Sequence, residues 1–167
     1  MGRCSYSSRW TVEDCKTITT KFLNKHNYFN SGVQCGDMNW NLNGNKTGSI
    51  SIAVSTVKGG GYIRFQYMQI DRDTEEAIRM DYKVRLASTP CYFGGRRWWF
   101  ICPLFVNGRA CCRRVGSLHL GNGKYFGCRH CYNLTYTSSQ ESHKLDTLFR
   151  DIGITAKQAK VLFPWVY

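Results

Sequence analysis

The chain has 167 residues, with 23 Lys and Arg against 11 Asp and Glu, which gives a formal net charge of +12. Its ordinary apolar content excludes disorder by composition, and no apolar run approaches the roughly 20 residues of a membrane helix. The strong positive balance favours an anionic partner. The first ten residues contain no hydrophobic signal region, so we expect a cytoplasmic protein with no membrane partner.

Residues 11–25 are predicted to form an N-terminal helix. Thr11 can cap this helix, and Asp14 stands three residues later in the capping-box position. Apolar side chains then recur at helical spacing, at Val12, Cys15, Ile18 and Phe22. Residues 27–46 are rich in Asn and Gly, which predicts a loop with a short strand at residues 38–42.

Three strands are predicted after this loop, at residues 49–56, 62–70 and 77–86. The third has the clearest pattern, because Arg79, Asp81, Lys83 and Arg85 alternate with apolar residues, as in a half-buried strand. The glycines at 59–61 indicate a turn between the first two strands. The short connections favour an antiparallel sheet with the first helix packed on its apolar face.

The last thirty residues are predicted to be helical. Ser138 can cap a helix that runs to about residue 151, Gly153 ends it, and Pro164 stops a second helix at residues 156–163. The expected fold class is therefore α+β: an N-terminal helix, a small antiparallel β-sheet, a Cys4 zinc ribbon and a helical C-terminal tail. The expected division is a helix-plus-sheet domain at 1–90, a zinc-ribbon module at 91–136 and the tail at 137–167.

Four of the nine cysteines have the spacing of a metal site. Cys128 and Cys131 form a C-x-x-C pair, which can place two thiolates on one ion at the tip of a tight turn. Cys102 and Cys111 are expected to complete the set, with the turn signal Asn107-Gly108 in the loop between them. Four thiolates leave no open coordination position, so we expect one structural Zn²⁺ without a catalytic role.

Other residues near these cysteines are alternative ligands. Cys111 and Cys112 are adjacent, and either can serve as a ligand. We favour Cys111, because Cys112 stands where such turns usually carry glycine. His119 and His130 are weaker substitutes, and Cys4, Cys15, Cys35 and Cys91 are expected to be structural.

Residues 82–140 contain no Asp or Glu but nine Lys and Arg, interleaved with aromatic residues. Arginine suits bidentate contacts to phosphates and base edges. One or both of Arg113 and Arg114 can instead donate hydrogen bonds to the thiolates. The predicted nucleic-acid contacts are Arg96, Arg97, Arg109, Arg113, Arg114, Lys124 and Arg129.

Residues 89–140 resemble a family of short bacterial and mobile-element proteins. The motifs that carry the resemblance are Phe93-Gly94-Gly95-Arg96-Arg97-Trp98-Trp99-Phe100, Cys102-Pro103, Cys111, Arg113-Arg114-Val115, Phe126-Gly127-Cys128-Arg129-His130-Cys131 and Ser139-Gln140. The resemblance implies a zinc-ribbon fold and no particular activity. The C-x-x-C pair and the residues after it are also similar to the zinc-binding N-terminal part of some insertion-sequence proteins.

The sequence therefore predicts a zinc-binding, nucleic-acid-binding protein of bacterial or mobile-element origin. The alternative is a protein-interaction module that inhibits a host nucleic-acid-processing or defence complex, in the manner of an anti-CRISPR protein, with a host protein or ribonucleoprotein as partner. No set of side chains has the spacing of a catalytic site, so we expect no enzymatic activity.

Overall fold

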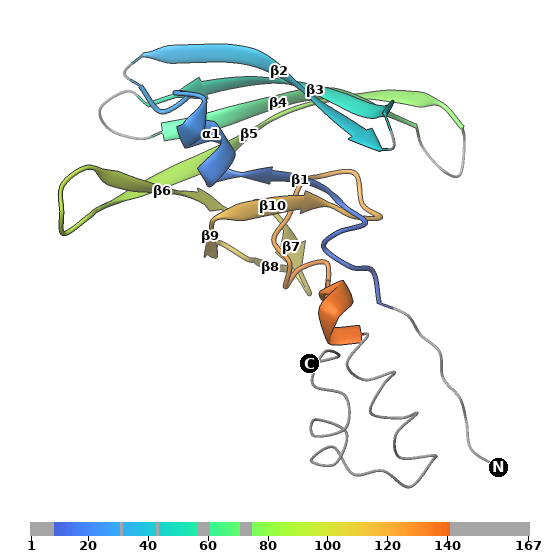
Figure 1. The fold of residues 1–167 in the computed structure, drawn as a ribbon. Helices are drawn as coiled ribbons and strands as arrows, with labels where there is room; N and C mark the ends of the chain where they lie inside the picture. Colours follow the sequence, from blue (N-terminus) through green and yellow to red (C-terminus); the bar gives the residue numbers. More distant parts are fainter. Residues whose placement is uncertain (1–8, 31, 43, 57–60, 71–74, 141–167) are drawn as a thin grey trace, which may run out of the picture.

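The computed structural model describes residues 9–30, 32–42, 44–56, 61–70 and 75–140. Its main feature is a six-stranded antiparallel sheet, which curls over the rest of the described chain (Figure 1). The strands, in their order across the sheet, are β2 (Val33–Leu42), β3 (Asn45–Ser55), β4 (Gly61–Ile70), β5 (Ala77–Pro90), β6 (Arg96–Ile101) and β9 (Arg114–Val115).

Smaller elements lie beneath one face of this sheet (Figure 1). They are the antiparallel pair β1 (Lys16–Thr19) and β10 (Ser117–Leu120), the hairpin β7 (Phe105–Val106) and β8 (Arg109–Ala110), and the six-residue helix α1 (Thr20–Lys25). We call the covered face the inner face and the opposite one the outer face. No helix of the described residues is long and apolar enough to cross a membrane.

The predicted α+β class is wrong, because the described chain is mainly β-structure and α1 is its only helix longer than one turn. The predicted helix at residues 11–25 is replaced by a turn, strand β1 and the short α1. The run Thr17-Ile18-Thr19-Thr20 is β-branched throughout and favours extended backbone, and β1 pairs with β10. Thr11 does bond Asp14 at 2.5 Å, but within a turn. Thr19 is the residue that caps a helix.

The predicted loop at residues 27–46 is wrong in its extent. Half of it forms the edge strand β2, which includes the predicted short strand at residues 38–42 and pairs with β3 from Val33↔Ser55 to Leu42↔Asn45. The polar, glycine-containing sequence of β2 does not predict a strand of this length, because an edge strand with little burial needs no alternation of apolar residues. Trp40 anchors this strand by donating from Nε1 to the Thr17 carbonyl in β1, at 3.2 Å.

The three predicted strands are present as parts of β3, β4 and β5. The glycine turn at 59–61 lies outside the described residues except for Gly61, which begins β4. Of the predicted tail, residues 137–140 form a helical turn. The remainder of the first tail helix and all of residues 156–163 lie outside the described residues.

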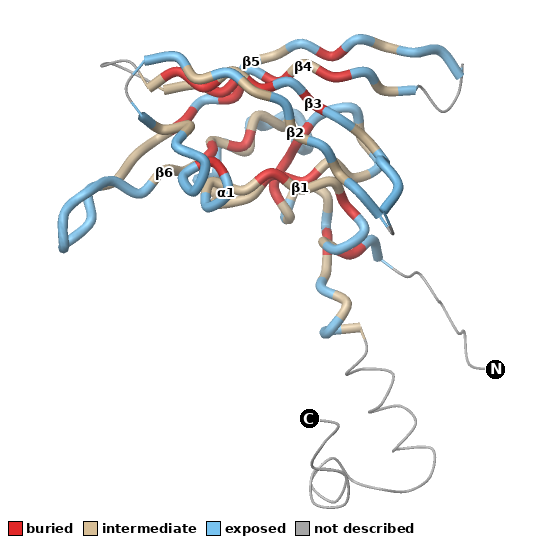
Figure 2. Tube along the Cα trace, turned by 45° about the horizontal axis from the view of Figure 1, so that its top comes forward, coloured by how far each residue is buried: buried red, intermediate tan, exposed pale blue. Residues whose placement is uncertain are grey.

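The hydrophobic core fills the space between the inner face and the elements beneath it (Figure 2). Apolar residues of β3, β4 and β5 supply most of the sheet side. The elements beneath the inner face contribute residues from both sides of position 90, the expected domain boundary. The largest of these residues is Phe126, which is only 1 % exposed. The buried members are Ile18, Leu23, Ile50, Ile52, Val54, Ile63, Phe65, Tyr67, Met80, Val84, Leu86, Phe100, Leu118 and Phe126.

Two tyrosines of the sheet hold the segment around Phe126 by hydrogen bonds. Tyr82 Oη accepts from the backbone N–H of Phe126 at 2.7 Å, and Tyr67 Oη donates to the carbonyl of Lys124 at 2.5 Å. The two hydroxyls are 3.3 Å apart. Burial raises the pKa of Tyr67 to about 12 and also raises that of Tyr82, so both remain neutral donors.

Replacing Tyr82 by Phe is expected to destabilise the protein by about 1–3 kcal/mol, because the buried N–H of Phe126 loses its hydrogen bond to the Tyr82 hydroxyl. Urea denaturation followed by tryptophan fluorescence measures the change. Tyr125→Phe is the matched control, since Tyr125 is 46 % exposed and its ring contact with Tyr82 survives the change. Equal stabilities of the two variants would contradict the assigned role of the Tyr82 hydroxyl.

Candidate metal centre and basic sheet face

The first pair of predicted ligands lies where β6 and β8 end. Cys102 follows β6 directly, and its N–H donates to the Arg113 carbonyl at 2.9 Å. Cys111 follows β8, and its N–H donates to the Leu104 carbonyl at 2.8 Å. The eight residues between them form the β7–β8 hairpin, which turns at Asn107-Gly108 as predicted, with φ of 52° and 74°. Hydrogen bonding across the base of this hairpin thus brings the two distant cysteines together.

The second pair lies in a tight turn after β10. Gly127 exchanges two backbone hydrogen bonds with His119, at 2.8 and 2.9 Å, which places Cys128 at the end of a short ladder. The N–H of Cys131 then donates to the Cys128 carbonyl at 3.1 Å. A Cβ at position 127 would come within 2.1 Å of Leu104. A larger residue at this position would therefore force the Leu104 side chain to move.

The four sulfur atoms form one compact cluster. All lie within 4.8 Å of one another, and the shorter separations are 3.5 Å for Cys128–Cys131 and 3.8 Å for both Cys102–Cys131 and Cys111–Cys128. These distances are far longer than a disulfide bond of about 2.05 Å, and all four cysteines are free. Cys102 and Cys128 are buried, whereas Cys111 and Cys131 are partly exposed. The cluster could hold one metal ion.

The environment of the cluster disfavours several negative charges unless a cation is present. A hydrogen bond shared between Cys102 and Cys128 lowers the pKa of Cys128 and raises that of Cys102. Burial is the main cause that raises the pKa of Cys131. The backbone N–H of Cys128 points at the sulfur of Cys102 at 3.3 Å. A metal ion would displace the thiol protons and take over their role of joining the sulfurs.

Arg113 lies beside the cluster, as expected if it donates hydrogen bonds to the thiolates. Its Nη1 is 4.0 Å from the sulfur of Cys111, and the charge of Cys111 raises the pKa of Arg113. Arg114 instead belongs to β9, on the outer face. Arg113 is therefore placed to offset the negative charge of the thiolates.

The alternative ligands lie outside the cluster. Cys112 is exposed and has a φ of 50°, the left-handed conformation that explains why glycine is common at this position. His119 is buried, with its ring nitrogens 2.8 Å from Thr17 Oγ1 and 3.3 Å from Ser117 Oγ. His130 is exposed and belongs to no metal-binding group of the described residues. Of the remaining cysteines, Cys15 is buried, Cys35 and Cys91 are exposed, and Cys4 lies outside the described residues.

The predicted nucleic-acid contacts are distributed over several elements. Phe100 and Val115 form an inward-facing pair. Because side chains alternate along a strand, Arg97, three residues before Phe100, and Arg114, next to Val115, lie on the outer face of the sheet. Arg96 begins β6, Arg109 is on β8, Lys124 precedes the second cysteine pair and Arg129 lies between its two cysteines. Arg129 packs over the ring of Tyr136 at 5.1 Å. The seven residues therefore do not form one patch on the ribbon.

The outer face gathers basic side chains that the predicted contacts omit. Lys83 and Arg85 alternate with the buried Val84 and Leu86, so they project outward from β5. Arg64 and Arg79 also belong to this face, and Asp81 binds Arg64 at 2.6 Å. The alternation of residues 77–86 in the sequence already indicated that Arg79, Lys83 and Arg85 share one face of the strand. Among the described residues, no element covers this face (Figure 1).

Aromatic rings lie among these cations. The ammonium group of Lys83 is 4.6 Å from the centre of the Tyr62 ring, and the guanidinium of Arg97 is 4.2 Å from that of Trp99. Both rings are partly exposed. We define the basic face as Tyr62, Arg79, Lys83, Arg85, Arg97, Trp99 and Arg114. It can bind a polyanion and offers two ring systems beside the charges.

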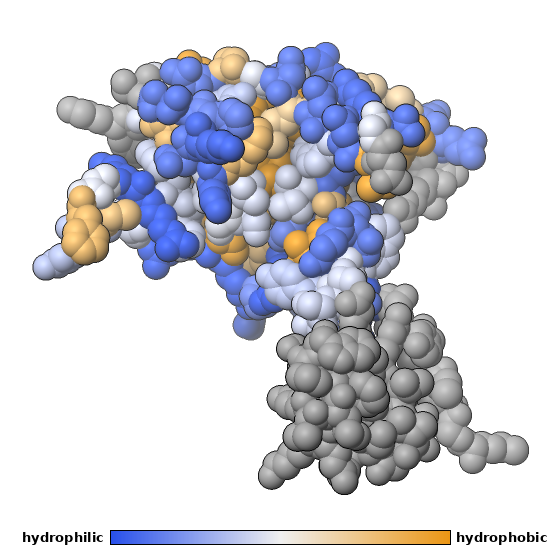
Figure 3. Space-filling view, viewed as in Figure 1, coloured by the Kyte–Doolittle hydropathy of each residue, from blue (hydrophilic) through white to orange (hydrophobic). Residues whose placement is uncertain are grey.

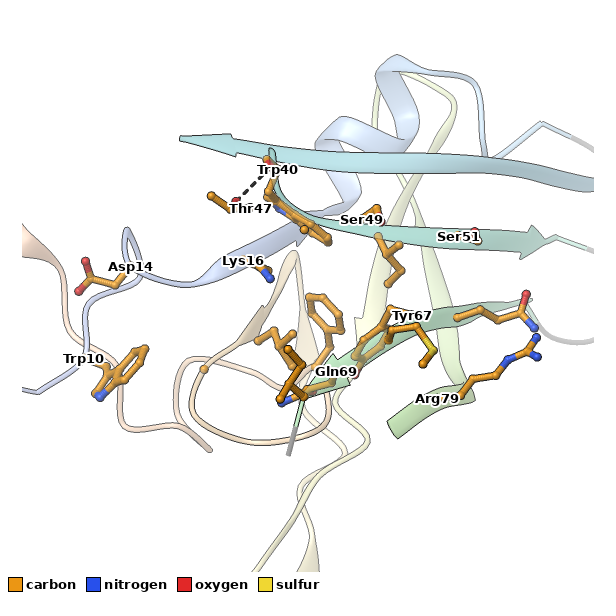
Figure 4. Close-up of a pocket in the computed structure, with 18 residues that line it drawn as sticks. Trp10, Asp14, Lys16, Trp40, Thr47, Ser49, Ser51, Tyr67, Gln69 and Arg79 are labelled. Carbon is orange, nitrogen blue, oxygen red and sulfur yellow. Dashed lines mark hydrogen bonds between the residues drawn. The ribbon is translucent and has the colours of Figure 1, made fainter. Parts of the chain in front are cut away.

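A cavity of about 870 Å³ opens where β3 and β4 separate, beyond the pair Ser51↔Gln66 (Figure 4). Trp40 and Lys16 lie on one side of it, and Tyr67 and Gln69 on the other (Figure 4). Gln69 donates from Nε2 to the Gly123 carbonyl at 3.1 Å, whereas no donor among the described residues reaches its buried Oε1. The cavity thus combines aromatic walls with one unpartnered hydrogen-bond acceptor.

Comparisons with protein-family models, curated proteins and solved structures give no match to this chain. The resemblance of residues 89–140 to a bacterial and mobile-element family therefore remains a prediction.

Replacing Cys111 by Ser is expected to reduce the bound metal by at least about tenfold after dialysis against a weak chelator, because one of four ligands is lost. Elemental analysis measures the metal-to-protein ratio. Cys112→Ser is the matched control, since the adjacent thiol lies outside the cluster, and it should retain metal as the wild type does. The opposite ranking of the two variants would assign the ligand to Cys112.

The stability of the protein is expected to fall below about pH 6.5 partly through His119. Burial lowers the pKa of this histidine in the folded state. Below the ordinary value of 6.5 the unfolded chain binds the proton more readily, so acidification favours unfolding until pH reaches the lower folded-state pKa. Comparing metal-loaded wild type with His119→Gln by thermal denaturation at several pH values isolates this contribution. Parallel pH profiles for the two proteins would show that His119 contributes nothing.

Proposed function

We propose that this protein is a zinc-binding, basic nucleic-acid-binding protein, in line with the bacterial or mobile-element family that it resembles. Zinc is the ion that best suits the cluster. Four thiolates around Zn²⁺ at about 2.3 Å in a tetrahedron lie about 3.8 Å apart, close to the separations of 3.5–3.8 Å between three of the sulfur pairs. A Cys4 set leaves no coordination position open, which supports a structural ion.

The role proposed for the ion is to stabilise the polypeptide around it. Cys102 and Cys111 would hold the ends of the β7–β8 hairpin, while Cys128 and Cys131 would hold the turn after Phe126. Structural zinc contributes on the order of 10 kcal/mol in small domains. The ion would thereby keep Phe126 and Leu118 packed under the sheet and preserve its curvature.

The observation that carries the proposed nucleic-acid binding is the basic face of the sheet. Its cations come from β5, β6 and β9 and share one surface, which no element of the described residues covers. Asp81, the acidic residue closest to them in register, already pairs with Arg64. A phosphate chain laid across β5 and β6 would meet Arg85 and Arg97 in succession, while the sheet holds both at fixed positions.

Aromatic rings on the same face favour single-stranded over duplex nucleic acid. The rings of Tyr62 and Trp99 lie beside Lys83 and Arg97, so phosphate contacts would place unpaired bases near them. Bases stacked inside a duplex are not available for such contacts. Arg113, which neighbours the thiolates, is not included in the proposed interface.

Neutralising two cations of the basic face with Lys83→Gln and Arg85→Gln is expected to weaken binding of zinc-loaded protein to a single-stranded oligonucleotide. The slope of log K against log salt should become shallower by about 1.4, because each lost phosphate contact on a single strand contributes about 0.7. Fluorescence anisotropy titrations across salt concentrations measure both quantities.

The matched control is Lys21→Gln with Lys25→Gln, which removes the same charge from α1 on the opposite side of the sheet. Equal effects of the two double variants would show that only net charge matters. Absence of wild-type binding at low salt would contradict the proposal and favour the alternative of a protein partner.

A further inference from the structure

Two aromatic side chains at the end of the β5–β6 hairpin are almost completely exposed. Tyr92 is 96 % and Phe93 is 97 % accessible, the highest values among the large hydrophobic residues of the described chain. The hairpin projects from the body of the molecule, and hydrophobic surface at its tip adjoins a strongly hydrophilic stretch (Figures 1 and 3). Exposing two neighbouring rings is unfavourable in isolation, which indicates that a partner covers them.

The tip has a defined backbone geometry. The N–H of Gly94 donates to the Cys91 carbonyl at 3.1 Å, and the N–H of Cys91 donates to the Gly95 carbonyl at 3.2 Å. Gly94 and Gly95 have φ of 86° and 76°, a conformation that only glycine adopts readily. The rings of Tyr92 and Phe93 are 5.1 Å apart and nearly perpendicular. The turn therefore presents both rings outward.

The stem connects this tip to the basic face. Arg96 and Arg97 follow the turn directly, and both are exposed. Arg97 packs over Trp99, whose Nε1 donates to Thr89 Oγ1 across the hairpin at 3.1 Å. Residues 82–140 contain no acidic side chain, so no carboxylate of this stretch opposes the two guanidinium groups. The charge beside the rings complements a phosphate chain.

We propose that Tyr92 and Phe93 stack on unpaired bases of the nucleic acid whose phosphates contact Arg96, Arg97 and the basic face. This inference rests on the proposed function and adds a second point of contact with different chemistry. The cations would bind the backbone without regard to sequence, whereas the perpendicular rings would each take one base. The strand would then run from the tip along β6 onto the sheet.

The test replaces both rings with Tyr92→Ser and Phe93→Ser in the full zinc-loaded chain. Single-stranded DNA that contains 2-aminopurine serves as the probe, because the fluorescence of this base reports its stacking. We expect the double variant to bind about tenfold or more weakly, with an unchanged slope of log K against log salt, because stacking releases no counterions. The 2-aminopurine signal that accompanies wild-type binding should be lost.

The matched control is Phe105→Ser, which removes an aromatic ring that is 73 % exposed on the separate β7–β8 hairpin. It should bind the probe as the wild type does. All three proteins should have the same thermal transition, since the replaced rings are not part of the core.

Three results would overturn the inference, and they differ in their consequences for the proposed function. If the double variant matches the wild type in affinity and 2-aminopurine signal, the tip does not stack on bases, although the basic face can still bind nucleic acid. If the wild type does not bind the probe at any salt concentration, the proposed function fails together with this inference. A variant that also loses salt slope would show that the tip acts only by holding Arg96 and Arg97.

Discussion

The arrangement of the whole molecule depends on the convergence of four sulfur atoms from two distant turns. One turn ends β6 of the large sheet, and the other follows β10 of the small sheet beneath it. Bringing these sulfurs within 4.8 Å of one another fixes the position of the lower layer against the inner face. Phe126, two residues before Cys128, is then buried against Phe65 and Tyr67, with ring centroids 5.2 and 5.6 Å apart. Metal binding and formation of the core are therefore expected to be coupled.

Because the lower layer packs on one side only, the two faces of the sheet differ in their surroundings. The inner face is occupied by β1, α1, β10 and the segment around Phe126, and it supplies rigidity. The outer face remains free in the described residues and carries the cations of β5, β6 and β9. The β5–β6 hairpin extends past the sheet, so its aromatic tip and basic stem continue this surface (Figure 1). The cysteine cluster follows β6 directly, and Arg114 of the basic face pairs with Ile101, the residue before Cys102, so a bound ion would help to fix this end of the surface.

The features that the sequence predicted correctly are those encoded by local patterns. The spacing of Cys128 and Cys131, the turn at Asn107-Gly108 and the alternation of residues 77–86 each reflect a short-range geometric requirement. The errors arose where distant pairing decides the outcome. The apolar residues Val12, Cys15, Ile18 and Phe22 have helical spacing, but pairing with β10 makes residues 16–19 a strand. The polar strand β2 is stabilised by β3, and its own composition shows no sign of this. The outer position of Lys83 and Arg85 followed from alternation, yet their contribution to a common face with Arg97 required the register of β5 and β6.

X-ray absorption at the zinc K edge of the metal-loaded protein tests the central claim most directly. The account predicts one zinc ion per chain, surrounded by four sulfur atoms at about 2.3 Å and no light-atom ligand. A shell that contains nitrogen or oxygen, fewer than four sulfurs, or no specifically bound zinc would contradict it. Such a result would mean that the four cysteines do not share one zinc ion, and that the hydrophobic core and the hydrogen bonds hold the two sheets together without it.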